Sequence, residues 1–233
     1  MDAKTLHALV DHNIGKIAGV YRLYTQALSF SLKHFVQSPS IDEARKELRK
    51  KARELKSDVR MQIVLLGDSS SLEIASARFY EQGIMLSDYQ EQYIKTLHNN
   101  WIEKIQDQMG SDERTVIKTF NSFVMRAELR AKAENTSFEA AIAAEQINYF
   151  KNPMFYNMDN LGRKYKSESF VEVETNWYFH RLINDIPLAL KIINNQEIEL
   201  YNGSENKIEA YSSDDIEKVQ ARLHPRSKRI VVF

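Results

Sequence analysis

The densest group of chemically capable side chains lies in residues 174–181, which read ETNWYFHR. Histidine can move protons near neutral pH, arginine can bind anions, and the three aromatic rings can stack on a ligand. The same residue types also fill the interior of a buried helix. Their helical spacing therefore has to be worked out before a function is assigned to them.

Helical spacing divides this stretch between two faces. At about 100° per residue, one arc of the helix is apolar and is predicted to face the core. Its members are Val171, Thr175, Tyr178, Phe179, Leu182, Ile183 and Ile186. The opposite side carries Phe170, Val173, Trp177, His180, Arg181 and Asn184. A helix that is apolar on both sides is either buried in the middle of the protein or offers its second face to something else.

We predict that this second face binds a protein partner. Trp177 and Arg181 lie four residues apart, within reach of a cation–π contact, and tryptophan and arginine are common anchors of protein interfaces. The predicted partner-binding residues are Phe170, Val173, Trp177, His180 and Arg181. Two alternatives remain open: a later part of the chain covers this face, or the face forms a small-molecule or catalytic site.

A second candidate is a basic patch on a predicted helix. The patch consists of Arg45, Lys46, Arg49, Lys50, Arg53, Lys56 and Arg60. Such a ridge can bind nucleic acid through counterion release. However, Glu47, Glu54 and Asp58 interleave with these residues in the sequence, and no aromatic residue is present there to stack on bases. A solvated outer face, an acidic protein surface and nucleic acid all remain possible interpretations.

The motifs of several enzyme classes are missing. The sequence contains no G-x-x-x-x-G-K-[ST], G-x-G-x-x-G or G-x-S-x-G pattern, and no cysteine. None of the six histidines lies in an H-E-x-x-H or Glu-x-x-His pair. We therefore predict no cofactor and no metal site, and we favour a non-catalytic protein. A helical enzyme with an unrecognised site remains an alternative.

The elements that position these residues are predicted to be helices. Only seven glycines and four prolines interrupt 233 residues. Helices are expected over 3–34, over 41–66, from a GDSSS break at 67–71 to about 86, over 88–109 up to a stop at Gly110, from 111 onwards, over 136–150, and from 170 to 196. Five capping boxes support helix starts. They are Ser40 with Glu43, Ser70 with Glu73, Ser87 with Gln90, Thr136 with Glu139, and Ser169 with Glu172.

The last part of the sequence changes character. After residue 196, alternating apolar residues around Asn202-Gly203 predict a β-hairpin, followed by a short helix over 214–223 and a strand over 229–233. We expect a mostly α protein: a bundle of long antiparallel helices with a small C-terminal hairpin/helix/strand appendage. The predicted partition is a bundle (1–150), an ordered loop pinned on it (151–168), a last helix kinked or broken at Pro187 (169–196) and the appendage (197–233).

Composition limits the choice of function. Lysine plus arginine and aspartate plus glutamate both number 32, so no global field draws the molecule towards a polyanion. The sequence shows no secretory signal and no apolar run of about 20 residues, so we expect a cytoplasmic protein without a membrane span. The predicted function is a non-catalytic interaction or adaptor subunit of a larger intracellular assembly, with nucleic-acid binding as the alternative.

Overall fold

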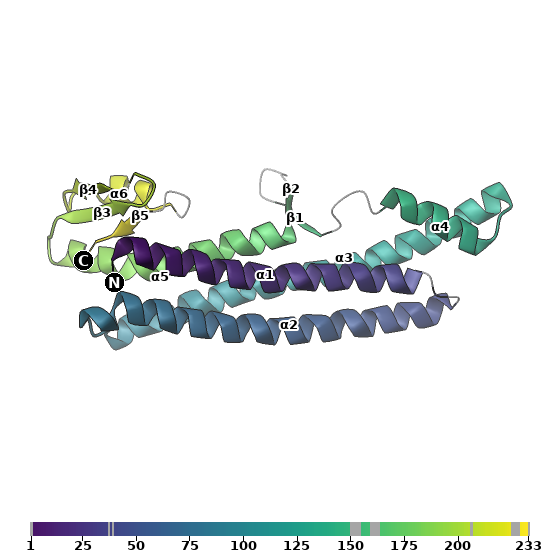
Figure 1. Ribbon diagram of the computed structural model, residues 1–233, viewed down its shortest axis with the longest axis horizontal. Helices are drawn as coiled ribbons and strands as arrows, with labels where there is room; N and C mark the ends of the chain where they lie inside the picture. The colour runs from purple at the N-terminus through teal and green to yellow at the C-terminus, as the bar shows by residue number, and fades with distance from the viewer. Residues whose placement is uncertain are drawn as a thin grey trace. The chain divides into compact units, whose positions relative to one another are not determined.

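The protein is built from long α-helices and a small C-terminal β-sheet. A computed structural model describes residues 2–36, 38, 40–149, 155–158, 164–205, 207–224 and 229–232, except for the side chains of residues 82 and 146–149. The elements are α1 (Ala3–Val36), α2 (Ile41–Arg78), the short 3₁₀ helix η1 (Tyr80–Gln82), α3 (Asp88–Glu134), α4 (Phe138–Tyr149), β1 (Tyr156–Met158), β2 (Lys164–Lys166), α5 (Ser167–Ile193), β3 (Ile198–Asn202), β4 (Lys207–Tyr211), α6 (Ile216–Arg222) and β5 (Arg229–Val231) (Figure 1).

This element order confirms the predicted fold class, including the hairpin, short helix and strand that follow the helices. Pro187 lies inside α5, which runs on to Ile193. Over the described ranges, none of the helices combines the length and the hydropathy needed to cross a bilayer.

The predicted helix break at residues 67–71 is wrong, because α2 runs through it. Gly67 is needed there for its small size: a Cβ atom on it would lie 2.4 Å from Cζ3 of Trp101. Two of the serines that follow, Ser70 and Ser71, use their hydroxyls in hydrogen bonds within the protein. Ser70 donates to Oδ1 of Asn13 at 2.9 Å, and Ser71 donates to the carbonyl of Gly67, so neither hydroxyl caps a new helix.

The predicted stop at Gly110 is also wrong, because α3 continues through it to Glu134. Asp112, which the sequence places at the start of a new helix, is instead buried in the middle of α3. Its carboxylate accepts a hydrogen bond from the hydroxyl of Tyr21 at 2.7 Å. A tertiary partner, rather than a helix terminus, explains the aspartate.

Helix starts are predicted more accurately where a capping box lies beside a true terminus. The box at Ser87 is confirmed, because its N–H donates to Oε1 of Gln90 at 2.9 Å and the N–H of Gln90 donates back to Oγ of Ser87 at 3.4 Å. At α4 the capping hydroxyl belongs to Ser137, one residue after the predicted threonine. At α5 the helix begins two residues before the predicted serine.

Contacts divide the chain into two compact units. Unit 1 comprises Met1–Ile17, Val64–Glu103 and Glu172–Phe233, and unit 2 comprises Ala18–Ile63 and Lys104–Val171. In unit 1 the strands form one antiparallel sheet in the order β4-β3-β5. The inner face of the sheet packs with α5 and α6 around a cluster of apolar side chains. The cluster consists of Leu188, Ile198, Leu200, Val219 and Val231.

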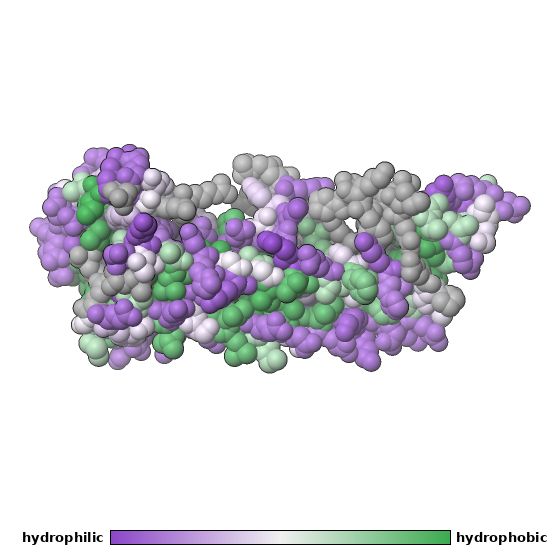
Figure 2. All heavy atoms as spheres, viewed as in Figure 1, coloured by the Kyte–Doolittle hydropathy of each residue, from purple (hydrophilic) through white to green (hydrophobic). Residues whose placement is uncertain are grey.

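Unit 2 has an aromatic core and a short β-ladder. Its largest fully buried side chains include Tyr21, Tyr24, Leu28, Leu32, Leu48, Phe120 and Phe123. Within the loop predicted at residues 151–168, β1 and β2 pair antiparallel. Residues 151–154 and 159–163 of that loop lie outside the described residues. On the face shown in Figure 2, hydrophobic side chains also reach the surface over α1 and α2.

Candidate functional site

The core-facing half of the aromatic stretch is confirmed. All seven side chains of the predicted arc are buried on α5, from Val171 at one end to Ile186 at the other. Tyr178 stacks on Trp101 of α3, with ring centroids 5.0 Å apart and planes inclined by 12°. The indole N–H of Trp101 donates to the hydroxyl of Thr175 at 3.2 Å. These side chains therefore fix α5 in unit 1 by packing.

The opposite half of the stretch is divided between surface and interior. Trp177 is 38% exposed and Arg181 is exposed, whereas His180 is 4% exposed. Phe170 and Val173 are partly buried. Of the five predicted partner-binding residues, Trp177 and Arg181 are thus the two that the structure places at the surface. The assignment of all five to a partner stays a prediction.

The C-terminal strand covers part of this face. The N–H of Val231 donates to Oδ1 of Asn184 at 2.8 Å, and the amide of Asn184 donates to the carbonyl of Arg229 at 3.3 Å. The buried guanidinium of Arg78, at the end of α2, donates to the carbonyl of Val231 on the same strand. Its Nε donates to the carbonyl of Ile183 at 3.0 Å. Side chains of α2 and α5 therefore form hydrogen bonds with backbone groups of β5.

His180 is buried next to this contact, and its imidazole ring is neutral. Burial is the main reason that the pKa of His180 falls to about 4, and the nearby His7 and His224 lower it further. The Asn184 amide nitrogen lies 3.2 Å from its Nδ1. An imidazole in this position is uncharged near neutral pH and is closed off from bulk solvent.

The two exposed residues are held in place by their neighbours. The ring of Trp177 meets His224 edge-on, with centroids 5.1 Å apart. Arg181 lies over the ring of Tyr93, 5.9 Å from its centroid, and donates to its hydroxyl at 2.8 Å and to Asp185 at 2.9 Å. Both side chains are therefore ordered at the surface of unit 1.

A hydrogen-bond chain that sequence reasoning missed lies in the same unit. Asp68 lies 3.0 Å from Nε2 of His98, whose Nδ1 lies 3.2 Å from the hydroxyl of Tyr178. That hydroxyl lies 2.6 Å from Oγ of Ser71. Burial raises the pKa of Tyr178 to about 12 and lowers the pKa of His98. The phenol therefore stays protonated, and the chain ties α2, α3 and α5 together.

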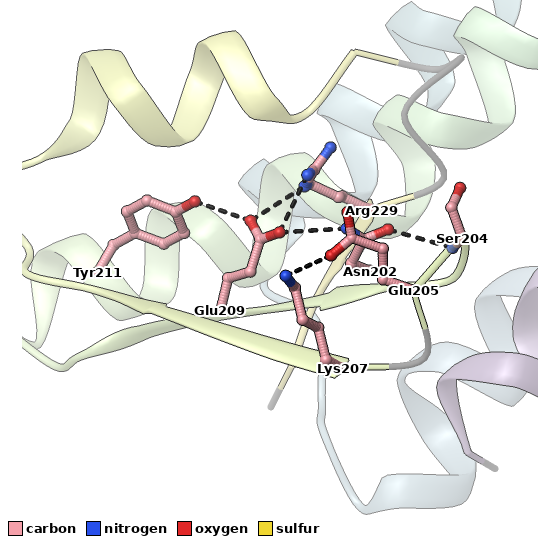
Figure 3. A network of polar contacts seen from close by, with 7 residues as sticks. All are labelled: Asn202, Ser204, Glu205, Lys207, Glu209, Tyr211 and Arg229. Carbon is pink, nitrogen blue, oxygen red and sulfur yellow. Dashed lines mark hydrogen bonds and ion pairs between the residues drawn. The ribbon is translucent and has the colours of Figure 1, made fainter.

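On the sheet, a second network gathers around Glu209 (Figure 3). Arg229 donates to both carboxylate oxygens, at 3.1 and 3.0 Å. The hydroxyl of Tyr211 adds a bond of 2.8 Å, and the amide of Asn202 adds one of 3.1 Å. Donation from Arg229 is the largest cause of the pKa of Glu209 falling to about 2. The pair links β4 to β5 across β3.

Among the described residues, the buried Asp112 of unit 2 has hydrogen-bond donors but no cation as partners. Oδ1 of Asp112 accepts from Ser167 at 2.8 Å and from Gln108 at 2.9 Å, while Oδ2 accepts from Tyr21. Burial outweighs these bonds and raises the pKa of Asp112 to about 6. Because Ser167 begins α5 and its N–H donates to the carbonyl of Phe155, the cluster fixes the start of α5 beside the β1–β2 ladder.

Two hollows flank this ladder in unit 2. One has a volume of about 480 Å³ and lies between α1 and β2, where Arg22, Phe30 and Lys166 are among its lining residues. The other has a volume of about 380 Å³ and is lined in part by Gln108 and Asn157. Over the described ranges, no group of three or more histidine and acidic side chains is arranged to hold a metal ion.

The predicted basic patch lies on the first half of α2, in unit 2. Arg45 and Lys56 are partly buried, and the other five residues of the patch are exposed. Arg45 pairs with Asp42 at 3.1 Å, and both Arg53 and Lys56 pair with Glu113 of α3. The structure therefore confirms that these residues share one helix, and leaves their partner a prediction.

Comparison of the chain with protein-family models, with curated proteins and with solved structures finds no match.

Proposed function

We propose that this protein is a non-catalytic interaction subunit of a larger assembly and that Trp177 with Arg181 is its contact surface for a protein partner. The observation that carries the proposal is the position of Trp177. A large aromatic ring stays 38% exposed on α5, while the adjacent Tyr178 and nearby His180 are buried. Aromatic and arginine side chains at a surface are the usual anchors of a protein interface.

The order already present in this surface supports the proposal. Asp185 and Tyr93 hold Arg181, and His224 lies against Trp177. Immobilising a flexible side chain on binding costs about 0.5–1.5 kcal/mol, so anchors that are ordered beforehand bind at a lower entropic cost. A fitting partner presents an apolar side chain to the indole ring and an oxygen acceptor to the guanidinium edge.

The state of the chemically capable groups favours binding over catalysis. His180 is buried and neutral, and Tyr178 keeps its proton. Over the described residues, no buried side-chain nitrogen or oxygen lacks a hydrogen-bond partner. Polar groups whose hydrogen bonds are all made within the protein stabilise the fold. Catalytic groups, in contrast, have to face a substrate.

The proposal is tested by capturing partners from the native cell with the wild-type chain and with Trp177→Ala and Arg181→Ala. We expect each variant to stay folded and to lose one partner by at least about tenfold, the effect of removing an interface anchor. Tyr89→Ala is the matched control, because Tyr89 is an aromatic residue of the same unit that is 82% exposed. Equal recovery of every partner by folded variants would overturn the proposal.

Unfolding must be separated from loss of binding. Thermal unfolding of each variant, followed by circular dichroism, provides this control. A variant that melts at the wild-type temperature and loses its partner supports an interface. If Trp177→Ala unfolds the protein, Trp177→Phe keeps an aromatic ring in the fold while removing the indole N–H. Full recovery of the partner by folded Trp177→Phe together with folded Arg181→Ala would again contradict the proposal.

A further inference from the structure

Seven of the eight basic residues between positions 45 and 60 lie on one flank of α2, although acidic residues interleave with them in the sequence. At about 100° per residue, all seven members of the patch fall within an arc of about 140° on one flank of the helix. The acidic residues Glu47, Glu54 and Asp58 fall together beyond that arc, and the eighth basic residue, Lys51, falls beside them. The core-facing side of this half of α2 is buried and apolar. It consists of Ala44, Leu48, Ala52 and Val59.

Helix α3 borders this basic flank and extends it. Nε of Arg45 donates to Asn121 at 3.0 Å, and Lys56 pairs with Glu113, so α3 runs antiparallel beside the flank between these two contacts. Arg114 and Lys118 are exposed on the same stretch of α3. The basic surface therefore draws residues from two helices of unit 2.

Much of this positive charge is not compensated. Asp42 pairs with Arg45, and Glu113 neutralises part of the charge of Arg53 and Lys56. Among the residues that the structure describes, four members of the patch have no ion-pair partner. They are Lys46, Arg49, Lys50 and Arg60. Since the chain as a whole is neutral, this flank is a local positive field on a molecule whose remaining residues carry a net negative charge.

We infer that this flank of α2 binds the phosphate backbone of nucleic acid. The inference is independent of the partner surface at Trp177, because the flank lies in unit 2 and Trp177 lies in unit 1. Sixteen helical residues extend for about 24 Å, so the cations run along a length that corresponds to about seven base pairs of duplex. Phosphates bound along it would release their condensed counterions, which supplies the affinity.

The composition of the flank favours nucleic acid over the other polyanions. A protein interface has an apolar core, but no large apolar side chain of α2 is exposed between residues 45 and 60. A helix that lies on an anionic membrane inserts an apolar face, and the apolar face of this half of α2 is buried in the core. Phosphate recognition needs only lysine and arginine at a surface.

The same composition predicts the kind of recognition. The flank has no aromatic side chain to stack on bases, so it contacts the backbone and does not read the sequence. Binding is therefore expected to be similar for duplexes of different sequence. Its affinity should fall steeply as the salt concentration rises.

The test measures fluorescence anisotropy of a labelled duplex of about 20 base pairs at several salt concentrations, with the full chain. The variant Lys46→Gln, Arg49→Gln, Lys50→Gln removes three exposed cations that lack ion-pair partners. We expect at least about a tenfold loss of affinity at about 50 mM salt, and a salt slope that is shallower by about two to three. The matched control Lys4→Gln, Lys16→Gln, Lys95→Gln removes the same charge from exposed sites of unit 1.

Each outcome has a defined meaning. Loss of affinity in the α2 variant but not in the control supports the inference, and Trp177→Ala should then bind the duplex normally. Equal losses of affinity in both variants would show an effect of net charge alone and would overturn the inference. Absence of duplex binding by the wild type at about 20 mM salt would overturn it as well. Binding of polyglutamate, or of vesicles rich in phosphatidylserine, in preference to the duplex would also overturn it. Unfolding curves confirm that both variants are folded.

Discussion

Each unit buries an ionisable side chain, and burial shifts the two pKa values in opposite directions. Unit 1 contains His180, whose pKa is lowered to about 4, and unit 2 contains Asp112, whose pKa is raised to about 6. In both cases burial disfavours the charged form. The consequence for stability has opposite sign, because a neutral histidine has lost a proton whereas a neutral aspartate has gained one.

The pH dependence of the two units follows from linkage. The folded state of unit 1 resists protonation of His180, so its stabilisation is present above about pH 6.5 and is lost as the pH falls towards 4. The folded state of unit 2 retains a proton on Asp112, so its stabilisation is present below about pH 4 and is lost as the pH rises through 6. Between pH 4 and 6 the two effects offset each other.

The largest expected effect concerns the buried arginine of unit 1. Arg78→Ala removes the donors to two backbone carbonyls, those of Ile183 and Val231, and leaves both buried. An unsatisfied buried acceptor costs about 1–3 kcal/mol, so we expect the free energy of unfolding to fall by about 4 kcal/mol. Urea unfolding at pH 7 measures this change.

The exposed Arg114 is the matched control. Arg114→Ala should change the free energy of unfolding by no more than about 0.5 kcal/mol. Arg78→Lys, which retains the charge but not the forked geometry, should fall between the two. An Arg78→Ala protein as stable as the Arg114→Ala protein would show that β5 does not depend on this contact.

The next effect separates the two pH responses. Asp112→Asn keeps the shape of the side chain and removes its titration, so only the response of unit 1 remains. Because each pKa unit corresponds to about 1.4 kcal/mol, the stability of the variant relative to wild type should rise by up to about 3 kcal/mol between pH 4 and 6. Urea unfolding across this range provides the comparison.

An exposed carboxylate on the same helix gives the control for that experiment. Asp107→Asn makes the same chemical change at an exposed position of α3. If Asp112→Asn and the wild type have superimposable profiles, Asp112 ionises equally easily in the folded and unfolded chains. The contrast between the two units would then rest on His180 alone.

The smallest of these effects concerns packing in unit 1. Gly67→Ala places a methyl group 2.4 Å from the ring of Trp101, and overpacking of this kind costs about 1–3 kcal/mol. Gly15→Ala, also in unit 1, has no atom within 4 Å of the new methyl group. It should stabilise the protein by about 0.5–1 kcal/mol through helix propensity. Thermal unfolding of both variants should therefore give shifts of opposite sign.

Periodicity predicts the helices and the core face of α5, because one residue's neighbours three and four positions away are enough to define a face. It does not predict the continuity of α2 and α3. Gly67 resembles a helix break because the sequence does not reveal the ring of Trp101, which lies 34 residues further along the chain and requires the space. A glycine can therefore stand in a sequence either because a helix ends there or because a neighbouring side chain needs the space.

The buried polar contacts were missed for a related reason. Asp112 resembles a helix cap, and its partner Tyr21 lies 91 residues away in the chain. Arg78 follows an apolar run without any local sign that it is buried. Such groups are defined by partners that only the folded chain brings together. The basic flank of α2 and its separation from the acidic residues, in contrast, follow from helical spacing along the sequence.

The contact between Arg78 and β5 sets an order of events during protein synthesis. The two partners are 153 residues apart, so at about 5–20 residues per second the ribosome makes Val231 about 8 to 30 s after Arg78. Until then Arg78 lacks its acceptor on β5, and the β3–β4 hairpin, once made, lacks its third strand. We therefore expect a chain that stops before residue 229 to lack the contribution of Val231 to the apolar cluster around Ile198 and Leu200.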